Sequence, residues 1–152
     1  MQVNQTQTYV DLNETLALRI IRSCPKALQG SGLEERHCAD ICRFKKKLQM
    51  SSRRQIELYS QNYPSISGDE RCLINAMAAA QSGHQDIVRQ FLNWLLPHWA
   101  VDQFEEDLGN IAAIFKEIDI DLTLKFTTPP ARREVAGLYA VIGSNRLFDG
   151  VA

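Results

Sequence analysis

Two cysteines and a histidine are the residues of this chain best placed to bind a metal. Cys38 and Cys42 are four positions apart, so a helix would carry both thiols on one face, and His37 precedes them. A structural zinc site needs four ligands and usually has cysteines paired at CxxC spacing, which is missing here. Cys24 and Cys72 would have to converge to complete the set. We therefore expect no metal or cofactor, and we predict buried, reduced thiols that pack as small apolar residues.

The histidines give a second possible centre of chemistry. His84 and His98 flank the most apolar segment of the chain, and a straight helix would hold them roughly 20 Å apart, too far to share a ligand. His98 stands beside Trp99 at an expected helix break, so a small ligand-binding or enzymatic pocket there is one alternative function. A capping or solvent-facing histidine is the simpler interpretation. The sequence has no Ser/His/Asp, phosphate-loop or HExxH pattern, and we expect no catalytic residues.

A basic run is the strongest electrostatic feature. It comprises Arg43, Lys45, Lys46, Lys47, Arg53 and Arg54. Such cations can contact phosphates, which makes a nucleic-acid-binding regulator the other alternative function. Lysines in the last turn of a helix also suit the negative end of its dipole. The pI of about 6.3 is below that of a typical DNA-binding domain, and no aromatic platform accompanies the run.

The net charge of −1 conceals a separation of charge along the chain. Residues 1–54 hold ten Lys/Arg and five Asp/Glu, residues 55–123 hold three and eleven, and residues 124–152 hold four and two. Asp102, Glu105, Glu106 and Asp107 are expected on the solvated face of a helix, in its first turns. The separation indicates either a surface for a charged partner or two halves of one domain that attract each other.

One helix followed by one extended segment is the most regular pattern in the chain. Residues 101–118 carry apolar side chains at steps of three and four, which places them in one buried stripe, and from residue 118 to 126 apolar and polar residues alternate as in a half-buried strand. Further helices are expected at 13–23, 33–48, 67–83 and 85–96, the third opened by a Ser67–Glu70 capping box. The last is apolar around most of its circumference, as a core or interface helix would be.

These patterns predict a helix-dominated α+β fold of about five helices. Its minor sheet would contain strands at 56–59 and 120–126, joined by a third at 138–142. An all-α bundle is the alternative. We expect one domain over residues 1–126 and a C-terminal extension over 127–152, which has the Pro129–Pro130 pair near its start and is either docked or flexible.

The middle of the chain resembles a bacterial family of small uncharacterised proteins. The resemblance consists of Ser51-Ser52-Arg53-Arg54, an alternating segment, a proline-containing loop, and Ser67-Gly68-Asp69-Glu70 opening an alanine-rich helix, about a third of the chain. Family members have a cysteine-rich loop where this chain has residues 60–64. The resemblance implies no function, and that departure removes the feature that would imply metal or redox chemistry.

Function is therefore expected to lie in recognition. We predict a non-catalytic protein-interaction or regulatory domain, with Trp94, His98 and Trp99 binding a protein partner or a second copy of the chain. The N-terminal residues show no signal peptide, and no apolar run approaches the length of a membrane span. We expect a cytoplasmic protein that does not engage a membrane.

Overall fold

The computed structural model describes residues 11–129. The helices in this range are α2 (Leu12–Arg22), α3 (Pro25–Gln29), α4 (Glu35–Ser51), α5 (Gly68–Gln81), α6 (Gln85–Leu95), the 3-10 helix η1 (His98–Ala100) and α7 (Val101–Glu117). No residue between 11 and 129 belongs to a strand, so the predicted α+β fold with its sheet is wrong and the all-α alternative is correct for this part of the chain. The predicted strand at 138–142 lies outside the described residues.

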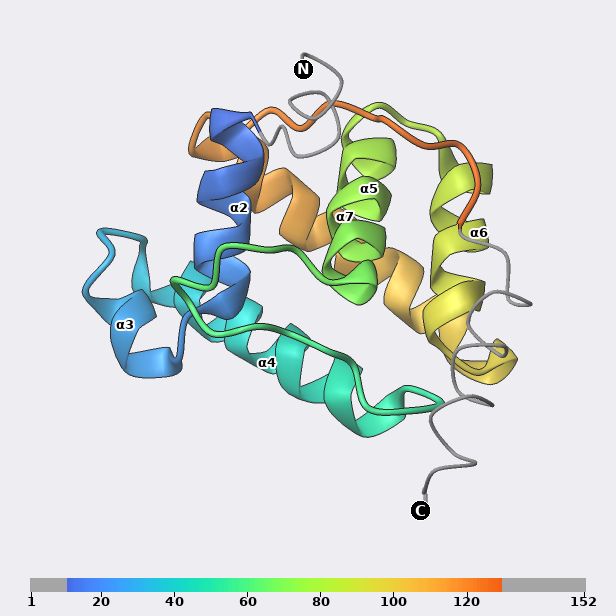
Figure 1. The fold of residues 1–152 in the computed structure, drawn as a ribbon, viewed down its shortest axis with the longest axis horizontal. Coiled ribbons are helices and arrows are strands. Elements are labelled where there is room, and N and C mark those ends of the chain that lie inside the picture. The colour runs from blue at the N-terminus through green and yellow to red at the C-terminus, as the bar shows by residue number, and fades with distance from the viewer. Residues whose placement is uncertain (1–10, 130–152) are drawn as a thin grey trace.

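Helix α5 lies at the centre of the molecule (Figure 1). It packs against α6 and α7 and contacts α2, and residues 72–79 are all buried. Alanines at 76, 78 and 79 allow the neighbouring helices to approach closely, because they add almost no side-chain volume. The small-residue stretch of the sequence therefore becomes the most enclosed part of the core.

The apolar stripe predicted for α7 is confirmed. Val101, Phe104, Leu108, Ile111 and Phe115 are all buried. Phe104 meets the Phe44 ring of α4 edge-on, with 5.9 Å between centroids. Helix α6 is more one-sided than its composition suggests, because its buried residues occupy one face. Its apolar surface therefore packs into the core.

The two predicted strands within residues 11–129 are extended segments that pair with helix side chains. Along 120–126 the alternation survives, since Ile120 and Leu122 are buried while Asp121 and Thr123 are exposed. The segment runs across the top of the molecule beside α5 (Figure 1), where Gln81 accepts from the Leu122 amide at 2.8 Å. The backbone groups of an extended segment must be satisfied, and here a helix supplies the partners that a neighbouring strand would have supplied.

The helix ends follow local rules. Asp11 caps α2 by accepting from the Glu14 amide at 2.8 Å, and the predicted Ser67–Glu70 capping box opens α5. At the end of α7, Asp119 adopts a left-handed φ of 66°. Within residues 11–129, none of the helices combines the length and apolar character that crossing a bilayer requires.

Candidate functional site

The most distinctive surface feature is the connection between α4 and α5. We call residues 57–66 of this connection the tyrosine loop: Glu57, Leu58, Tyr59, Ser60, Gln61, Asn62, Tyr63, Pro64, Ser65 and Ile66. Residues 60–65 are all exposed, and no part of the loop is helical. Its inward anchors are Leu58 and Ile66, which pack against the core. Most of the loop therefore contributes nothing to the hydrophobic interior.

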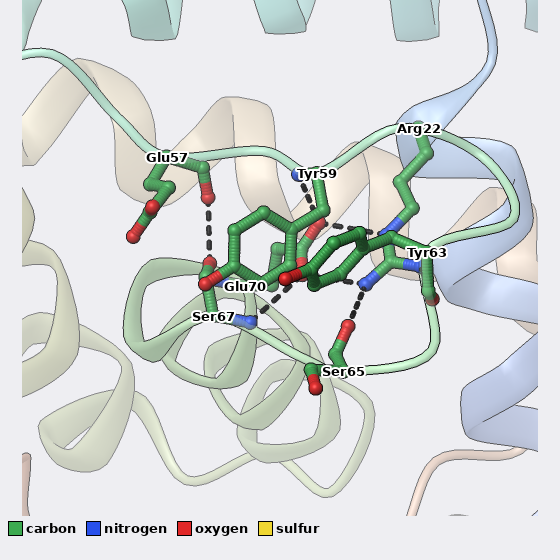
Figure 2. Close-up of polar contacts among 7 residues, drawn as sticks. All are labelled: Arg22, Glu57, Tyr59, Tyr63, Ser65, Ser67 and Glu70. Atoms are coloured by element: carbon green, nitrogen blue, oxygen red, sulfur yellow. Dashed lines mark hydrogen bonds and ion pairs between the residues drawn. The ribbon is translucent and has the colours of Figure 1, made fainter.

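The loop is held from below by the carboxylate of Glu70, whose side chain is fully buried (Figure 2). Glu70 Oε1 accepts from the Ser67 amide at 2.9 Å, and Oε2 accepts from the Tyr59 amide at 2.8 Å. Each oxygen also accepts from Arg22, through Nη2 and Nε respectively, at 2.8 Å. A carboxylate has about four acceptor positions, and here all four are filled.

Arg22, the last residue of α2, completes the attachment. Its guanidinium donates from Nη1 to the Tyr63 carbonyl at 3.0 Å and from Nη2 to the Ser65 carbonyl at 2.6 Å. The Arg22 side chain is 5% exposed. One buried ion pair therefore joins α2, α5 and both sides of the tyrosine loop.

Arg22 and Glu70 each shift the pKa of the other so that the charged form is favoured. Burial by itself raises the pKa of Glu70, but hydrogen bonds from Arg22 and from the Ser67 and Tyr59 amides outweigh it and hold the pKa below its ordinary value. The hydrogen bond to Glu70 likewise raises the pKa of Arg22. Both groups are charged at neutral pH. Because Glu70 is saturated with donors, it is suited to holding backbone and unsuited to exchanging protons with a substrate.

A second ion pair fixes the start of the loop. Asp69 accepts from both terminal nitrogens of Arg54, at 2.7 and 2.8 Å, and from the Glu57 amide at 2.7 Å. The Ser67 hydroxyl donates to the Glu57 carbonyl at 2.6 Å. The first two residues of α5 after Gly68 are therefore both buried acids, and both bind backbone of the tyrosine loop.

The outer surface of the loop carries two aromatic rings. Tyr59 and Tyr63 lie 4.4 Å apart between centroids, tilted by 47°, and Tyr63 is 48% exposed. The Arg22 guanidinium carbon lies 5.9 Å from the Tyr59 ring centroid. Gln61 extends sideways and donates to the Ser23 hydroxyl at 3.1 Å. The result is a patch of aromatic and neutral polar groups on a loop whose backbone is held by two buried acids.

The predicted partner-binding residues differ in how far they are exposed. Trp99 on η1 is 76% exposed and His98 beside it is also exposed. Trp94 is half-buried in α6, with the Arg54 guanidinium 5.1 Å from its ring centroid. The buried indole nitrogen of Trp94 has no hydrogen-bond partner among the described residues. Trp94 therefore belongs largely to the scaffold, while Trp99 and His98 are available at the surface.

Most of the predicted basic run is engaged in the fold. Arg43 pairs with Asp40 at 2.9 Å, Lys47 with Asp107 at 2.6 Å, and Arg54 with Asp69. Lys45 donates to the Ser23 carbonyl at 2.5 Å. Lys46 and Arg53 are exposed. The sequence places six cations within residues 43–54, but the fold pairs three of them with carboxylates and directs a fourth onto a backbone carbonyl.

A depression of about 130 Å³ lies between α4 and α7. Its charged lining residues are Asp40, Arg43, Lys47 and Asp107, which are the two ion pairs just described. It therefore presents no net charge to attract an ionic ligand.

The possible metal ligands do not converge. Within residues 11–129 no three His, Cys, Asp or Glu side chains lie close enough together to hold a metal ion. His37 is buried and its Nε2 lies 3.1 Å from Glu117, and His84 is exposed at the start of α6. Cys38 and Cys72 are buried as predicted, but Cys24 is exposed and Cys42 is half-buried. The prediction of buried thiols is therefore confirmed for Cys38 and Cys72, wrong for Cys24, and not met by the half-buried Cys42.

Sequence patterns missed the tyrosine loop as a site. Glu70 was predicted only as part of a capping box, and its partner Arg22 lies 48 residues earlier. One usable signal was present: residues 58–68 form an uncharged run with two tyrosines, placed directly before two acids.

Comparison with known proteins adds no relative. The chain matches no protein-family model, and the searches of curated proteins and of solved structures find no similar protein. The resemblance of its middle third to small bacterial proteins therefore stays an expectation.

Proposed function

We propose that the chain is a non-catalytic protein-interaction domain and that the tyrosine loop is its binding surface. The observation that carries the proposal is the Arg22–Glu70 pair, a fully buried and fully hydrogen-bonded attachment for a loop that is itself mostly exposed. Binding residues are commonly found on loops that a rigid scaffold positions. A loop already fixed in one conformation loses little conformational entropy when a partner binds, and this favours affinity.

The composition of the loop supports the same proposal. Tyrosine gives a large contact area with few rotatable bonds, while serine, asparagine and glutamine form adaptable hydrogen bonds. Tyrosine is also among the residues that dominate binding energy at protein interfaces. Between residues 58 and 66 there is no charged side chain, so recognition would rely on shape and hydrogen bonding.

A cytosolic location and a protein partner or second copy of the chain are parts of this proposal. All four cysteines are unpaired, which is typical of a reducing compartment. The alternative of a nucleic-acid-binding regulator is less well supported, because Arg43, Lys47 and Arg54 already pair with carboxylates. Phosphate contacts would have to compete with those pairs.

The test is quantitative capture of partners by the full chain and by two alanine variants. Tyr63→Ala removes an exposed ring but keeps the backbone carbonyl that binds Arg22, so the loop should stay in place. Trp99→Ala is the matched control, since it removes an even more exposed aromatic residue from a different element. We expect Tyr63→Ala to lose the proteins that the wild-type chain retains and Trp99→Ala to keep them.

The same samples should be passed over a size-exclusion column with mass measurement. A dimer that Tyr63→Ala dissociates would identify the partner as a second copy. If Trp99→Ala loses the retained proteins while Tyr63→Ala keeps them, the binding surface is at η1 and the tyrosine loop is not the site. If the wild-type chain is monomeric and retains nothing, the proposal of an interaction domain fails.

A further inference from the structure

The extended segment that follows α7 is bound to the fold in the way a separate peptide would be. We call residues 120–126 the strap. Helix side chains bind its backbone groups: Asn13 of α2 donates to the Asp121 carbonyl at 2.9 Å, and Gln81 and Asn75 of α5 bind the backbone of residues 120, 122, 125 and 126. Each bond joins a short extended segment to a surface already formed by helices. None of them requires the strap to belong to the same chain.

Apolar and charged side chains complete the fit of the strap. Ile120 and Leu122 are 3% and 7% exposed and belong to the core. Near the end of the strap, the Lys125 ammonium lies 3.0 Å from the carboxylate of Glu14 on α2, a side chain that is 9% exposed. Without the strap, the surface on α2 and α5 would expose apolar side chains and Glu14 would lose this partner. The surface therefore needs an occupant with apolar residues at alternate positions and a cation near its end.

The strap is joined to α7 by a strained turn. Asp119 has a left-handed φ of 66°, which is unfavourable for a residue with a β-carbon. The turn reverses the chain, so that the strap returns from the end of α7 past α2 and α5 (Figure 1). If residues 118 and 119 instead continued α7, Asp119 would adopt the right-handed conformation that it prefers. The strap would then project beyond the end of α7, out of reach of its own binding surface.

We propose that the strap exchanges reciprocally between two copies of the chain, with residues 118 and 119 as the hinge. The occupant of each surface is then the strap of the second copy, which has by identity the groups that the surface binds. The exchange retains the contacts of the closed monomer and relieves the strain of two hinges, and short strained hinges favour this route to a dimer. The net charge of −1 gives little repulsion between two copies.

This inference does not rest on the tyrosine loop. The strap binds the first turn of α2 through Asn13 and Glu14, whereas the loop is bound by Arg22, the last residue of the same helix. Exchange therefore leaves the tyrosine loops of both copies in place. Tyr63→Ala should not affect the exchange dimer, so a dimer held by the strap is distinguishable from one held by the tyrosine loop.

The test asks whether the Glu14–Lys125 ion pair lies within one chain or between two. Equal amounts of 15N-labelled and unlabelled full chain are mixed, concentrated to about 1 mM, the order of the effective concentration of a tethered segment, and incubated until the dimer fraction is constant. Monomer and dimer are separated by size exclusion and treated with a carbodiimide, which joins contacting carboxylates and amines. We expect Glu14–Lys125 linked peptides that combine both labels in the dimer and carry a single label in the monomer.

The Lys47–Asp107 pair is the matched internal control. Its nitrogen and oxygen lie 2.6 Å apart and join α4 to α7, so neither residue moves with the strap. Its linked peptides should carry a single label in both fractions. Mixed labels at this pair would show that the crosslinks arise from chance encounters between chains.

Variants of the hinge test the role of strain. Asp119→Gly relieves the closed turn, so the dimerisation constant should fall about tenfold, because two hinges contribute to each dimer. Asp119→Ala keeps the β-carbon and should dimerise like the wild type. Asp119→Pro cannot form the closed turn, since its ring fixes φ at about −65°, and should shift the population towards the dimer.

Three results would overturn the exchange. One is a wild-type chain that stays monomeric at about 1 mM, whatever Asp119→Pro does. Another is a dimer whose Glu14–Lys125 links carry a single label, because its two copies would then associate side by side with their straps in place. The third is a dimer that Tyr63→Ala dissociates and Asp119→Gly leaves unchanged, which would assign the contact to the tyrosine loop.

Discussion

Glu70 is the residue on which the attachment of the tyrosine loop depends most. Its two oxygens are used symmetrically, since each accepts one backbone amide and one nitrogen of Arg22. Burying such a pair stabilises the fold little compared with apolar packing, but removing one partner leaves the other charged and enclosed. A strong effect is therefore expected from even a nearly isosteric change.

We predict that Glu70→Gln destabilises the fold by about 3 to 5 kcal/mol. The glutamine amide would put a donor where an oxygen accepts two donors, and Arg22 would lose its counter-charge. Urea denaturation measures the change in the free energy of unfolding. Arg36→Ala is the control, since its partner Glu34 is 64% exposed and such pairs contribute roughly 0 to 1 kcal/mol. Equal effects of the two substitutions would contradict the structural role of Glu70.

Lowering the pH should reduce the difference in the free energy of unfolding between the wild type and Glu70→Gln. Because the folded-state pKa of Glu70 is lowered, its carboxylate stabilises the fold fully above the ordinary carboxyl pKa and loses this effect as the pH falls through the folded-state value. The variant has no proton to gain at that position. The free energies of unfolding of the two proteins, measured over the acid range, should therefore converge. A difference that stays constant with pH would show that the destabilisation by Glu70→Gln is not electrostatic.

Asp119 lies in a backbone conformation that suits glycine better. The Ile120 amide donates to the Phe115 carbonyl and the Asp119 amide to the Lys116 carbonyl, the two bonds of a Schellman motif with Asp119 in the left-handed position. A left-handed residue with a side chain costs about 1 to 2 kcal/mol, and the added freedom of an unfolded glycine costs about 0.4 to 1 kcal/mol. We predict that Asp119→Gly stabilises the protein by up to about 1 kcal/mol, measured as a rise in thermal midpoint.

Asp119→Ala is the matched control for that prediction. It removes the same charge but keeps a β-carbon in the left-handed conformation, so it should not stabilise the protein. An equal rise in thermal midpoint in both variants would mean that loss of the carboxylate is responsible, and not removal of the strain of a left-handed residue with a β-carbon.

At the scale of elements, α5 replaces the sheet that the alternating segments predicted. Gln81 donates to the carbonyls of Ala112 and Ile120 and accepts from Leu122, while Asn75 binds the backbone of Lys125 and Phe126. Two side chains of α5 therefore bind backbone groups of Ile120, Leu122, Lys125 and Phe126. The acids at the start of the helix do the same for residues 57 and 59.

This arrangement explains why sequence patterns succeeded for helices and failed for the sheet. A period of 3.6 residues reports which face of a helix is buried, and the stripe of α7 was predicted correctly because its signal is local. A period of two reports only that a segment is extended and half-buried. The backbone partner of that segment is chosen by tertiary structure, and a glutamine on α5 gives no sign in sequence that it will take this role.

We predict that Gln81→Ala exposes the Leu122 amide to hydrogen exchange while the Lys125 and Phe126 amides keep their protection. The Leu122 amide would lose its acceptor, but Asn75 would still hold the later part of the segment. Asn75→Ala should give the reverse pattern. Amide exchange followed by NMR resolves the two cases, and loss of all three protections in either variant would show that the segment is held as one unit.

At the scale of the whole molecule, ion pairs link parts of the chain with opposite net charge. Arg22 binds Glu70, Lys47 binds Asp107 and Arg54 binds Asp69, so cations of the basic first third meet acids of the middle. The separation of charge along the sequence was open to two interpretations, and these contacts favour attraction within one domain. The site was harder to predict than the fold, because Arg22 and Glu70 acquire their roles only when α2 and α5 pack together.

The final prediction concerns how the tyrosine loop opens. Arg22 and Glu70, which hold the loop, lie in α2 and α5, so releasing the loop requires disruption of buried contacts between these two helices. Although most loop residues are exposed, the loop should therefore resist proteolysis. Cleavage by chymotrypsin after Tyr59, followed by mass spectrometry of the fragments, should be slow in the wild type and should accelerate with urea as steeply as global unfolding does. In Glu70→Gln the same cleavage should be fast and nearly independent of low urea, because local opening then suffices.

Cleavage after Trp99 in the same digests is the internal reference. The side-chain hydrogen bonds of Arg22 and Glu70 go to residues 59–67 and to each other and not to η1, so local opening of η1 should be unchanged in the variant. Fast, urea-independent cutting after Tyr59 in the wild type would mean that the buried pair does not restrain the loop. In that case the loop would have to be ordered by its partner, and the entropic advantage that favours it as a binding surface would be lost.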